Sequence, residues 1–251
     1  MDKLNELTKR IMRNRSANKS PDNQYDCPRC KDTGWLYRQD KNGYEYAYRC
    51  DCFAIRQAKE LIRNSGISAE FQSKTFDNFS TGNNAQLSNA KDRAMQFVTN
   101  FEQTEHHRHN SIMFCGQVGA GKTHLGTAIC GELMNRGIAV NYMPYRNALT
   151  KLKQNIIDEN GYNRELTKYT AARVLYIDDL LKGRLTESDV NIMYEIVNYR
   201  YMNNMPIIIS TEKEPNDLLV FDEAIGSRII EMCRGNIIQF RGKELNYRLN
   251  F

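Results

Sequence analysis

The sequence lacks any apolar run long enough to cross a membrane. A bilayer span needs roughly 18 to 20 consecutive apolar residues, and no stretch of this chain approaches that length. The N-terminus, Met1-Asp2-Lys3-Leu4-Asn5-Glu6, also lacks the apolar stretch of a secretory signal peptide. We therefore expect a cytoplasmic protein that makes no contact with a membrane.

Neither disulfides nor a strong charge are indicated. The seven cysteines are an odd number, and their spacing suits metal binding better than disulfide bonds. The net charge of +5 and the pI of 8.7 are only mildly basic. Domains that bind DNA strongly usually exceed pI 9 and cluster their basic residues. The charge is therefore compatible with nucleic-acid contact but does not indicate it.

The chain is long enough for one domain with a real core and a smaller module. An amphipathic segment with Leu4, Leu7 and Ile11 on one face comes first, and a turn-rich stretch follows it. A helical segment at 53–63 ends at Asn64-Ser65-Gly66, a typical helix stop. We therefore predict an N-terminal module of residues 1–66 and a core of residues 67–251.

Beyond residue 84, helical and extended patterns alternate. Short apolar runs bounded by turn residues predict buried strands, and longer amphipathic stretches predict helices. The expected strands are 111–115, 139–143, 174–177, 206–210 and 236–240, and the expected helices are 84–101, 123–136, 146–158, 187–203 and 222–234. This alternation implies an α/β fold with a parallel sheet covered on both faces.

One glycine-rich motif is typical of phosphate binding. It follows a predicted strand, opens a predicted helix and reads G-x-x-x-x-G-K-T: Gly116, Gln117, Val118, Gly119, Ala120, Gly121, Lys122 and Thr123. The glycines let the loop curl, so that backbone N–H groups and the helix dipole face phosphate oxygens. We expect ATP here, with Lys122 on the β- and γ-phosphates and Thr123 on Mg²⁺. His124 is counted among the nucleotide-binding residues.

An acidic pair, Asp178 and Asp179, ends the predicted strand at 174–177. We expect Asp178 to bind Mg²⁺, usually through water, and Asp179 to polarise the attacking water. Phosphoryl transfer requires little beyond in-line positioning and charge neutralisation, so few groups suffice. The alternative is that both aspartates only cap the next segment. Because many P-loop ATPases carry Glu in the second position, the shorter Asp179 could make hydrolysis slow.

Four cysteines are spaced as in a metal site: Cys27, Cys30, Cys50 and Cys52. Four thiolates can form a closed tetrahedral zinc site, and a hairpin turning at Asn42-Gly43 would return the second pair to the first. The alternative is a module of unliganded thiols, which would then lack a core. The remaining three cysteines lie on apolar faces and are expected in the core. The His-rich stretch 105–109 is expected to be a solvated loop rather than a metal site.

Together these motifs resemble the DnaC/DnaI-type replicative helicase loaders, close to the IstB-like ATPases, within the AAA+ superfamily. The phosphate motifs alone are shared by many NTPases, and their order together with the cysteine module is specific. The resemblance covers nearly the whole chain, and the last segment looks most like loaders of phages and Gram-positive bacteria. Besides the motifs above, it rests on residues 75–79, 195–201, 208–212, 226–231 and 242–249.

The resemblance implies an AAA+ P-loop core with an N-terminal, zinc-binding, helicase-interaction module. Residues 75–79 would lie near the adenine, and Ser210-Thr211 would fall at the sensor 1 position, where the candidate is Thr211 or Glu212. Arg228 would be the arginine finger offered to a neighbouring subunit. The chain after Arg228 is too short for the helical lid that AAA+ proteins usually carry. We therefore expect a second subunit to complete the nucleotide site.

We predict an ATPase that loads a hexameric replicative helicase onto single-stranded DNA. It would self-associate when bound to ATP or helicase, and its slow hydrolysis would be stimulated by partners. An IstB-like ATPase serving a transposase, a small-molecule kinase and a zinc-anchored adaptor with an inactive site remain alternatives. Single-strand binding combines basic and aromatic side chains, although an ordinary amphipathic helix and loop would look the same. The candidates for DNA contact are Lys151, Lys153, Arg164, Lys168, Arg173, Tyr145, Tyr162 and Tyr169.

Overall fold

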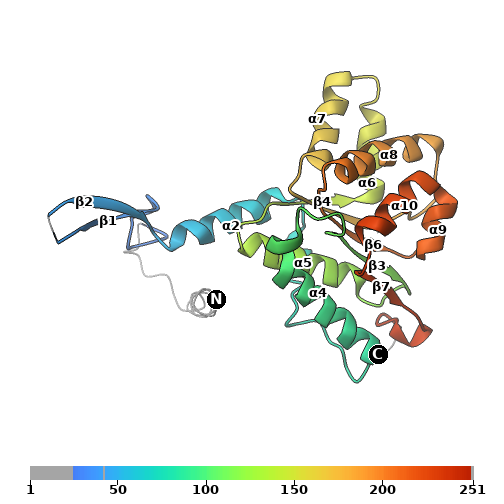
Figure 1. Cartoon of the computed structure of the whole chain (residues 1–251), viewed down its shortest axis with the longest axis horizontal. Coiled ribbons are helices and arrows are strands. Elements are labelled where there is room, and N and C mark those ends of the chain that lie inside the picture. The colour runs from blue at the N-terminus through green and yellow to red at the C-terminus, as the bar shows by residue number, and fades with distance from the viewer. Residues whose placement is uncertain (1–24, 42, 250–251) are drawn as a thin grey trace. The chain divides into compact units, whose positions relative to one another are not determined.

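The computed structural model describes residues 25–41 and 43–249 (Figure 1). The predicted amphipathic segment with Leu4, Leu7 and Ile11 lies outside these residues. The chain divides between Glu60 and Leu61 into two compact units, which are described separately. The functional boundary at Gly66, placed shortly after this division, remains a prediction.

The first unit contains the predicted hairpin. Strand β1 (Trp35–Gln39) pairs antiparallel with β2 (Glu45–Arg49), and Trp35 lies opposite Arg49. The guanidinium carbon of Arg49 lies 3.7 Å from the Trp35 ring centre and 3.9 Å from that of Phe53. Helix α2 (Cys52–Asn64) follows at once. The hairpin therefore brings the residues just before β1 next to those just after β2.

The second unit is built on a five-stranded sheet in the order β4-β5-β6-β3-β7. Its strands are β3 (Ile112–Gly116), β4 (Val140–Pro144), β5 (Val174–Leu180), β6 (Ile207–Thr211) and β7 (Ile237–Phe240). All neighbouring pairs are parallel, which confirms the α/β prediction. Because the carboxyl ends of parallel strands share one edge, the loops after β3, β5 and β6 meet there.

Two predicted helices need correction. The predicted helix 146–158 is α6, which ends at Gln154, and a separate helix α7 follows at Glu159. The predicted helix 222–234 is α10, and a short helix α9 that was not predicted precedes it. The helices of this unit are α3 (Ala69–Gln72), α4 (Ala85–Thr104), α5 (Lys122–Asn135), α6 (Tyr145–Gln154), α7 (Glu159–Thr170), α8 (Glu187–Met202), α9 (Pro215–Phe221) and α10 (Glu223–Met232), with a 3₁₀ turn, η2 (Lys243–Leu245).

Helices cover both faces of this sheet, as Figure 1 shows for the second unit. Helices α4 and α5 pack on one face, where their apolar side chains join alternate strand residues such as Phe114 and Tyr176. Helices α6, α7, α8 and α10 pack on the other face against Met113, Leu175 and Ile177. Successive strand residues point to opposite faces, so one strand supplies both cores. None of the helices in the described part of the chain is long and apolar enough to span a membrane.

Candidate functional site

The glycine-rich motif forms a tight loop between β3 and α5. Gly116 and Gly121 have φ values of 97° and 86°, in the left-handed region that glycine adopts without strain. A Cβ on Gly116 would lie 2.3 Å from the carbonyl oxygen of Phe240, and one on Gly121 would lie 2.6 Å from the Phe79 ring. Backbone and ring approach too closely at these positions for any larger residue. Helix α5 begins directly at Lys122.

Lys122 lies inside this loop and is 7% exposed. Its Nζ donates hydrogen bonds to the carbonyl oxygens of Gly116 at 2.8 Å and Gln117 at 2.7 Å. Burial lowers the pKa of the ammonium group. The lysine therefore holds a positive charge against the inner side of the loop, where the motif predicts phosphate.

Asp178, at the end of β5, is 5% exposed and accepts hydrogen bonds from four hydroxyl groups. Thr123 and Tyr176 donate to Oδ1 at 2.9 Å, and Ser210 donates to the same oxygen. Tyr142 donates to Oδ2, also at 2.9 Å. Burial and the nearby Asp178 charge raise the pKa of both tyrosines, so each phenol keeps its proton. The structure thus joins the two residues predicted to hold Mg²⁺, Thr123 and Asp178.

Asp179 does not join this cluster. Its backbone has a φ of 58°, and its Oδ2 lies 2.9 Å from Nζ of Lys182. Lys182 also lies 3.3 Å from Glu212, and the hydrogen bond that Lys182 donates to Asp179 raises the pKa of Lys182. The side chains of Asp179 and Lys182 are both well exposed, at 41% and 48%. The predicted role of Asp179 in polarising water remains a prediction.

At the sensor 1 position, Ser210 contacts the acidic residue and Thr211 does not. The Ser210 hydroxyl donates to Asp178 and accepts the backbone N–H of Asp179 at 3.0 Å. Thr211 is fully buried, and its hydroxyl donates to the carbonyl oxygen of Leu180 at 2.7 Å. Within this segment Ser210 is the residue that contacts the acidic residue, whereas Glu212 pairs with Lys182. The sensor role of Thr211 or Glu212 remains a prediction.

The segment 75–79 packs against the start of α5. His124 Nε2 lies 2.9 Å from the carbonyl oxygen of Thr75 and 3.0 Å from Oδ1 of Asn78. The rings of Phe79 and His124 meet edge to face, with centres 5.1 Å apart. Because Nε2 faces two acceptors, it carries the ring proton and donates to both. His124 therefore links the phosphate loop to the segment predicted to lie near the adenine.

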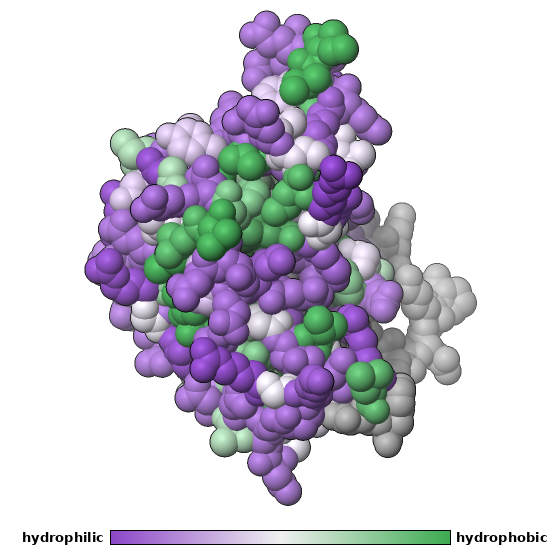
Figure 2. All heavy atoms as spheres, turned by 90° about the vertical axis from the view of Figure 1, so that its right-hand side faces the viewer, coloured by the Kyte–Doolittle hydropathy of each residue, from purple (hydrophilic) through white to green (hydrophobic). Residues whose placement is uncertain are grey.

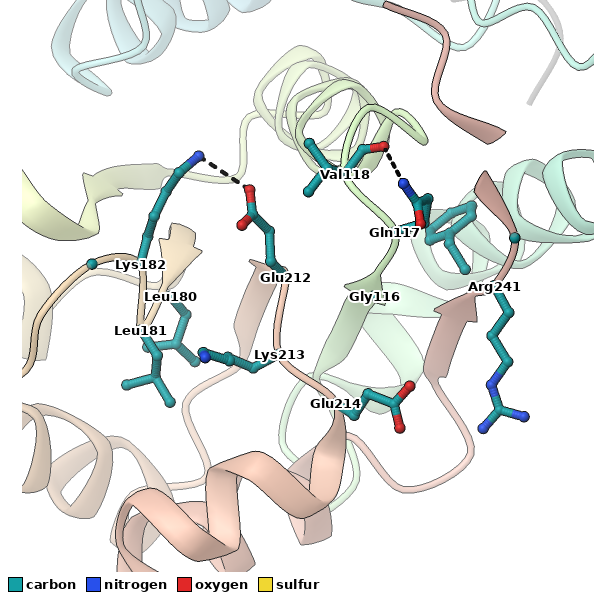
Figure 3. A pocket seen from close by; sticks show the side chains of 13 residues that line it. Gly116, Gln117, Val118, Leu180, Leu181, Lys182, Glu212, Lys213, Glu214 and Arg241 are labelled. Carbon is teal, nitrogen blue, oxygen red and sulfur yellow. Dashed lines mark hydrogen bonds and ion pairs between the residues drawn. The ribbon is translucent and has the colours of Figure 1, made fainter. Parts of the chain in front are cut away.

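A pocket of about 580 Å³ opens beside the first residues of the phosphate loop. Figure 3 shows its lining, which comes from three loops at the carboxyl edge of the sheet and from the residues after β7. Lys182 and Glu212 form an ion pair across one side of it, and Glu214 and Arg241 lie at another. The pocket is therefore polar, of mixed charge, and open next to the acidic pair.

Arg228 lies on α10 and folds back onto its own chain. One guanidinium nitrogen donates to the carbonyl oxygen of Ala224 at 2.7 Å. The rest of the group lies over Tyr194 and Tyr201, both on α8. The predicted role of Arg228 in a neighbouring site remains a prediction.

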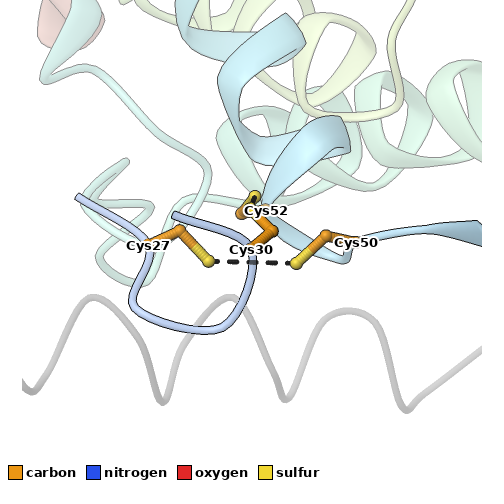
Figure 4. A group of neighbouring side chains, drawn as sticks. All are labelled: Cys27, Cys30, Cys50 and Cys52. Atoms are coloured by element: carbon orange, nitrogen blue, oxygen red, sulfur yellow. Dashed lines mark hydrogen bonds between the residues drawn. The ribbon is translucent and has the colours of Figure 1, made fainter. Parts of the chain in front are cut away.

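The four predicted metal ligands meet in the first unit (Figure 4). The Sγ atoms of Cys27, Cys30, Cys50 and Cys52 all lie within 4.8 Å of one another. A tetrahedral zinc site with Zn–S distances of about 2.3 Å has sulfurs about 3.8 Å apart, and Cys27 and Cys50 are 3.8 Å apart. Burial raises the pKa of Cys30, but the Gly34 N–H and the neighbouring thiols outweigh it and lower the pKa to about 6. The donor set therefore fits zinc.

The three remaining cysteines lie in the core as predicted, whereas the His-rich stretch 105–109 is only partly solvated, because Glu105 is buried and pairs with Arg173. Cys115, Cys130 and Cys233 are fully buried in the core. His109 is bonded to the carbonyl oxygen of Glu231 at 2.8 Å. Among residues 25–41 and 43–249, the four cysteines above are the only cluster with three or more candidate metal ligands.

Most candidates for DNA contact between residues 145 and 173 have structural roles. Tyr145 and Tyr169 are buried, at 1% and 5% exposure. Ion pairs engage Lys153 with Asp189, Lys168 with Glu165, and Arg173 with Glu105. These contacts favour the ordinary amphipathic interpretation of this segment.

Comparison with known proteins places the second unit in a family. Residues 71–233 match the model of the bacterial DnaA ATPase domain. The phage-like element PBSX protein XkdC of Bacillus subtilis (strain 168) is 38% identical over 259 residues, which span 99% of this chain and 95% of the relative. The replicative helicase loader DnaC of Escherichia coli (strain K12) is 27% identical over 179 residues, covering 70% of this chain and 69% of DnaC.

Comparison of the fold with solved structures finds proteins of the same kind. The crystal structure of DnaI superimposes with a TM-score of 0.57 and 21% identity, covering 70% of this chain and 93% of that one. Sequence and fold together confirm the AAA+ resemblance and assign the chain an ATPase domain. The chain belongs to the family of the bacterial DnaA ATPase domain, with the DnaC/DnaI-type helicase loaders among its relatives.

Proposed function

We propose that the chain is an ATP-dependent loader that delivers a hexameric replicative helicase to single-stranded DNA. The observation that carries this proposal is the phosphate loop at 116–123 joined to Asp178 through Thr123, in a chain related to a helicase loader over most of its core. The near full-length relation to XkdC supports a role for the cysteine module as well as the ATPase domain. We expect slow hydrolysis that partners stimulate.

In this proposal the loop binds ATP, and Lys122 neutralises charge on its β- and γ-phosphates. Thr123 and Asp178 would hold Mg²⁺, which supplies charge neutralisation on the phosphates when bound. Thr123 already donates its proton to Asp178, so the lone pairs of its hydroxyl oxygen are free for the metal. Asp179 would orient the attacking water after its ion pair with Lys182 has broken.

A second copy of the chain would complete the site. The pocket beside the phosphate loop carries Glu214, an acid that suits an incoming arginine such as Arg228 of the neighbour, whereas Glu212 already pairs with Lys182. Figure 2 shows apolar side chains gathered on the side of the second unit that bears α9. On that helix Val220 is 87% exposed and Leu219 is 37% exposed. Large exposed apolar patches mark protein–protein contacts, which supports self-association or partner binding here.

The cysteine module would dock on the helicase. Its four thiols fit one zinc ion, which would fix the hairpin. The hairpin exposes Tyr37 and Tyr44 at 74% and 73%, and tyrosine is enriched at the energetic centres of protein interfaces. These exposed rings support a protein-binding role for the module.

The test begins with an affinity-tagged full-length chain expressed in its host, in parallel with Lys122→Ala. We expect the replicative helicase to be captured by both, since docking is assigned to the cysteine module. Purified helicase is then offered a closed single-stranded DNA circle, and only the unmodified chain with ATP should leave helicase bound to the circle. Capture of a transposase instead would support the IstB-like alternative. Capture without ATP-dependent loading would support an adaptor, and phosphate transfer to a small acceptor would support a kinase.

A further inference from the structure

Two tyrosine hydroxyls on neighbouring strands hold the Asp178 carboxylate. Tyr142 on β4 donates to Oδ2 at 2.9 Å, and Tyr176 on β5 donates to Oδ1 at 2.9 Å. The Tyr176 hydroxyl also lies 3.3 Å from the carbonyl oxygen of Thr123, but the nearer, charged acceptor takes the proton. Neither tyrosine belongs to the phosphate motif or the acidic pair. Their hydroxyls are nevertheless two of the four that Asp178 accepts.

The sheet register produces this arrangement. Residues 176 and 178 are two apart on β5, so both side chains point to the face that carries α5. Tyr142 pairs directly with Tyr176 across β4 and β5, and the two rings lie 5.4 Å apart. On α5, a Cβ at Gly126 would lie 2.6 Å from the Tyr176 hydroxyl and ring. Because residue 126 of α5 has no side chain, the Tyr176 ring can pack directly against this helix.

The donors divide unevenly between the two carboxylate oxygens. Oδ1 accepts from Thr123, Tyr176 and Ser210, which fill its accepting capacity. Among the described residues, Oδ2 accepts from Tyr142 alone and so keeps a free lone pair. With one donor fixed on Oδ2 and a full shell on Oδ1, the plane of the carboxylate cannot rotate without breaking charge-assisted hydrogen bonds. Only one direction then remains for a water molecule that Asp178 would share with a metal.

We propose that Tyr142 and Tyr176 are positioning residues that hold Asp178 in the orientation in which it serves the magnesium ion of bound ATP. The inference rests on the proposed ATPase function. A purely structural role is the competing explanation, because both rings also pack in the core around α5. The phenol oxygens separate the two explanations, since Phe keeps the ring and removes only the donor. Partners of this kind typically change metal affinity or activity by 10- to 100-fold when mutated.

The experiment compares Tyr142→Phe, Tyr176→Phe and the double variant with the unmodified chain. Affinity for a fluorescent ATP analogue is measured with EDTA and across a Mg²⁺ titration, together with the Mg²⁺ dependence of hydrolysis. We expect the half-saturating Mg²⁺ concentration to rise about tenfold for each single variant. Affinity in EDTA should stay within twofold. Tyr145→Phe is the matched control: Tyr145 is 1% exposed, and its hydroxyl has no hydrogen-bond partner within residues 25–41 and 43–249.

Each outcome has a defined meaning. An unchanged or lower Mg²⁺ requirement in the Phe variants, with a clear Mg²⁺ effect in the unmodified chain, would overturn the inference. Equal loss of nucleotide affinity with and without Mg²⁺ would also overturn it, because that result indicates general damage to the loop. A Tyr145→Phe variant with the same rise would do so too. If the unmodified chain binds no nucleotide, the proposed function itself has failed.

Discussion

The guanidinium carbon of Arg228 lies 5.3 Å from the ring centre of Tyr201 and 5.5 Å from that of Tyr194. Both rings belong to α8 of the same chain. Arg228 is partly buried, and cation–π contacts range from about 0.5 to 1 kcal/mol at exposed sites to about 2 kcal/mol when desolvated. An arginine finger worth 10³ to 10⁵ in rate contributes about 4 to 7 kcal/mol. If Arg228 reaches a neighbouring γ-phosphate, the free energy lost by breaking its contacts with the two tyrosines is therefore smaller than the free energy gained in the transition state.

We predict that Arg228→Ala binds ATP normally but loses the hydrolysis stimulated by helicase or single-stranded DNA, by about 10³-fold. Mixing it with Asp179→Asn should restore part of the stimulated rate, because one variant supplies the arginine and the other an intact site. Arg234→Ala, at an exposed position just beyond α10, is the control and should keep the full rate. No recovery in the mixture, with assembly intact, would show that Arg228 does not act across an interface.

Removal of the loop cation should weaken ATP binding directly. In Lys122→Ala the two carbonyl oxygens that now face the ammonium, Gly116 and Gln117, would face the phosphates without a counter-charge. We expect ATP affinity to fall more than tenfold, which is more than about 1.4 kcal/mol. Isothermal titration calorimetry measures this, with Lys151→Ala on exposed α6 surface as the control. Equal affinities in the two variants would contradict the site assignment.

Zinc content and the fold of the hairpin should change together. We expect about one zinc ion per chain by elemental analysis, lost in Cys50→Ser and kept in Cys115→Ser, whose sulfur is buried in the ATPase core. Trp35 is the single tryptophan and lies in β1 beneath Arg49, so its fluorescence reports on the module alone. A zinc-selective chelator, with Mg²⁺ kept in excess, should change this fluorescence while leaving ATP binding nearly intact. A metal-free preparation with unchanged Trp35 emission would refute the zinc assignment.

Arg200 on α8 should be important for stability. It is fully buried, and its guanidinium donates to the backbone carbonyls of Tyr169, Thr170, Ala172, Arg173 and Pro206. Arg200→Met would remove the buried donor that these carbonyls share, so we expect a loss of about 3 kcal/mol or more in unfolding free energy. Urea denaturation measures the loss, and Arg164→Met on exposed α7 surface should stay within about 0.5 kcal/mol of the unmodified chain.

The start of α8 should confer a pH-dependent stability. Burial raises the pKa of Asp189, but hydrogen bonds from Lys153 and Thr186 outweigh it and hold the pKa below its usual value. The carboxylate therefore stabilises the fold fully above the unfolded value of about 3.9 and loses this effect as the pH falls through the lower folded value. Asp189→Asn should cost about 1 to 2 kcal/mol at pH 7, because it removes a charged hydrogen-bond acceptor, and less at pH 3. Parallel unfolding curves at the two pH values test this, and a constant difference would contradict it.

The sequence was most informative where local pattern and function coincide. The phosphate loop, the strand before it and the helix after it were all expected, because glycine spacing and apolar runs are local signals. Helix α9 had a local signal that we missed, since Glu214 and Asp217 form a capping box with Pro215 at the first turn. Helix α7 was harder to separate from α6, because the two are divided by a few residues of ordinary polarity.

The surroundings of Asp178 illustrate what a single sequence does not reveal. The contact of Tyr176 with Asp178 could be predicted from the sequence, because alternation on a strand puts the two side chains on the same face. The contacts of Tyr142 and Ser210 could not, because they depend on how β4 and β6 flank β5. Likewise, the choice between Ser210 and Thr211 depends on an irregular register between Ile177 and Leu180. Pairing across strands is a long-range property that no local motif records.

The strand end that packs against the phosphate loop comes from a distant part of the chain. Phe240, at the end of β7, accepts a hydrogen bond from the Gln117 N–H at 3.0 Å, and its carbonyl group lies against Gly116. Ribosomes add about 5 to 20 residues per second, so the loop emerges roughly 6 to 25 s before this strand. A nascent chain thus contains the whole phosphate motif several seconds before it contains the strand that packs against that motif. We therefore expect full ATP affinity only in chains translated through Phe240, and weaker binding in shorter products of interrupted translation.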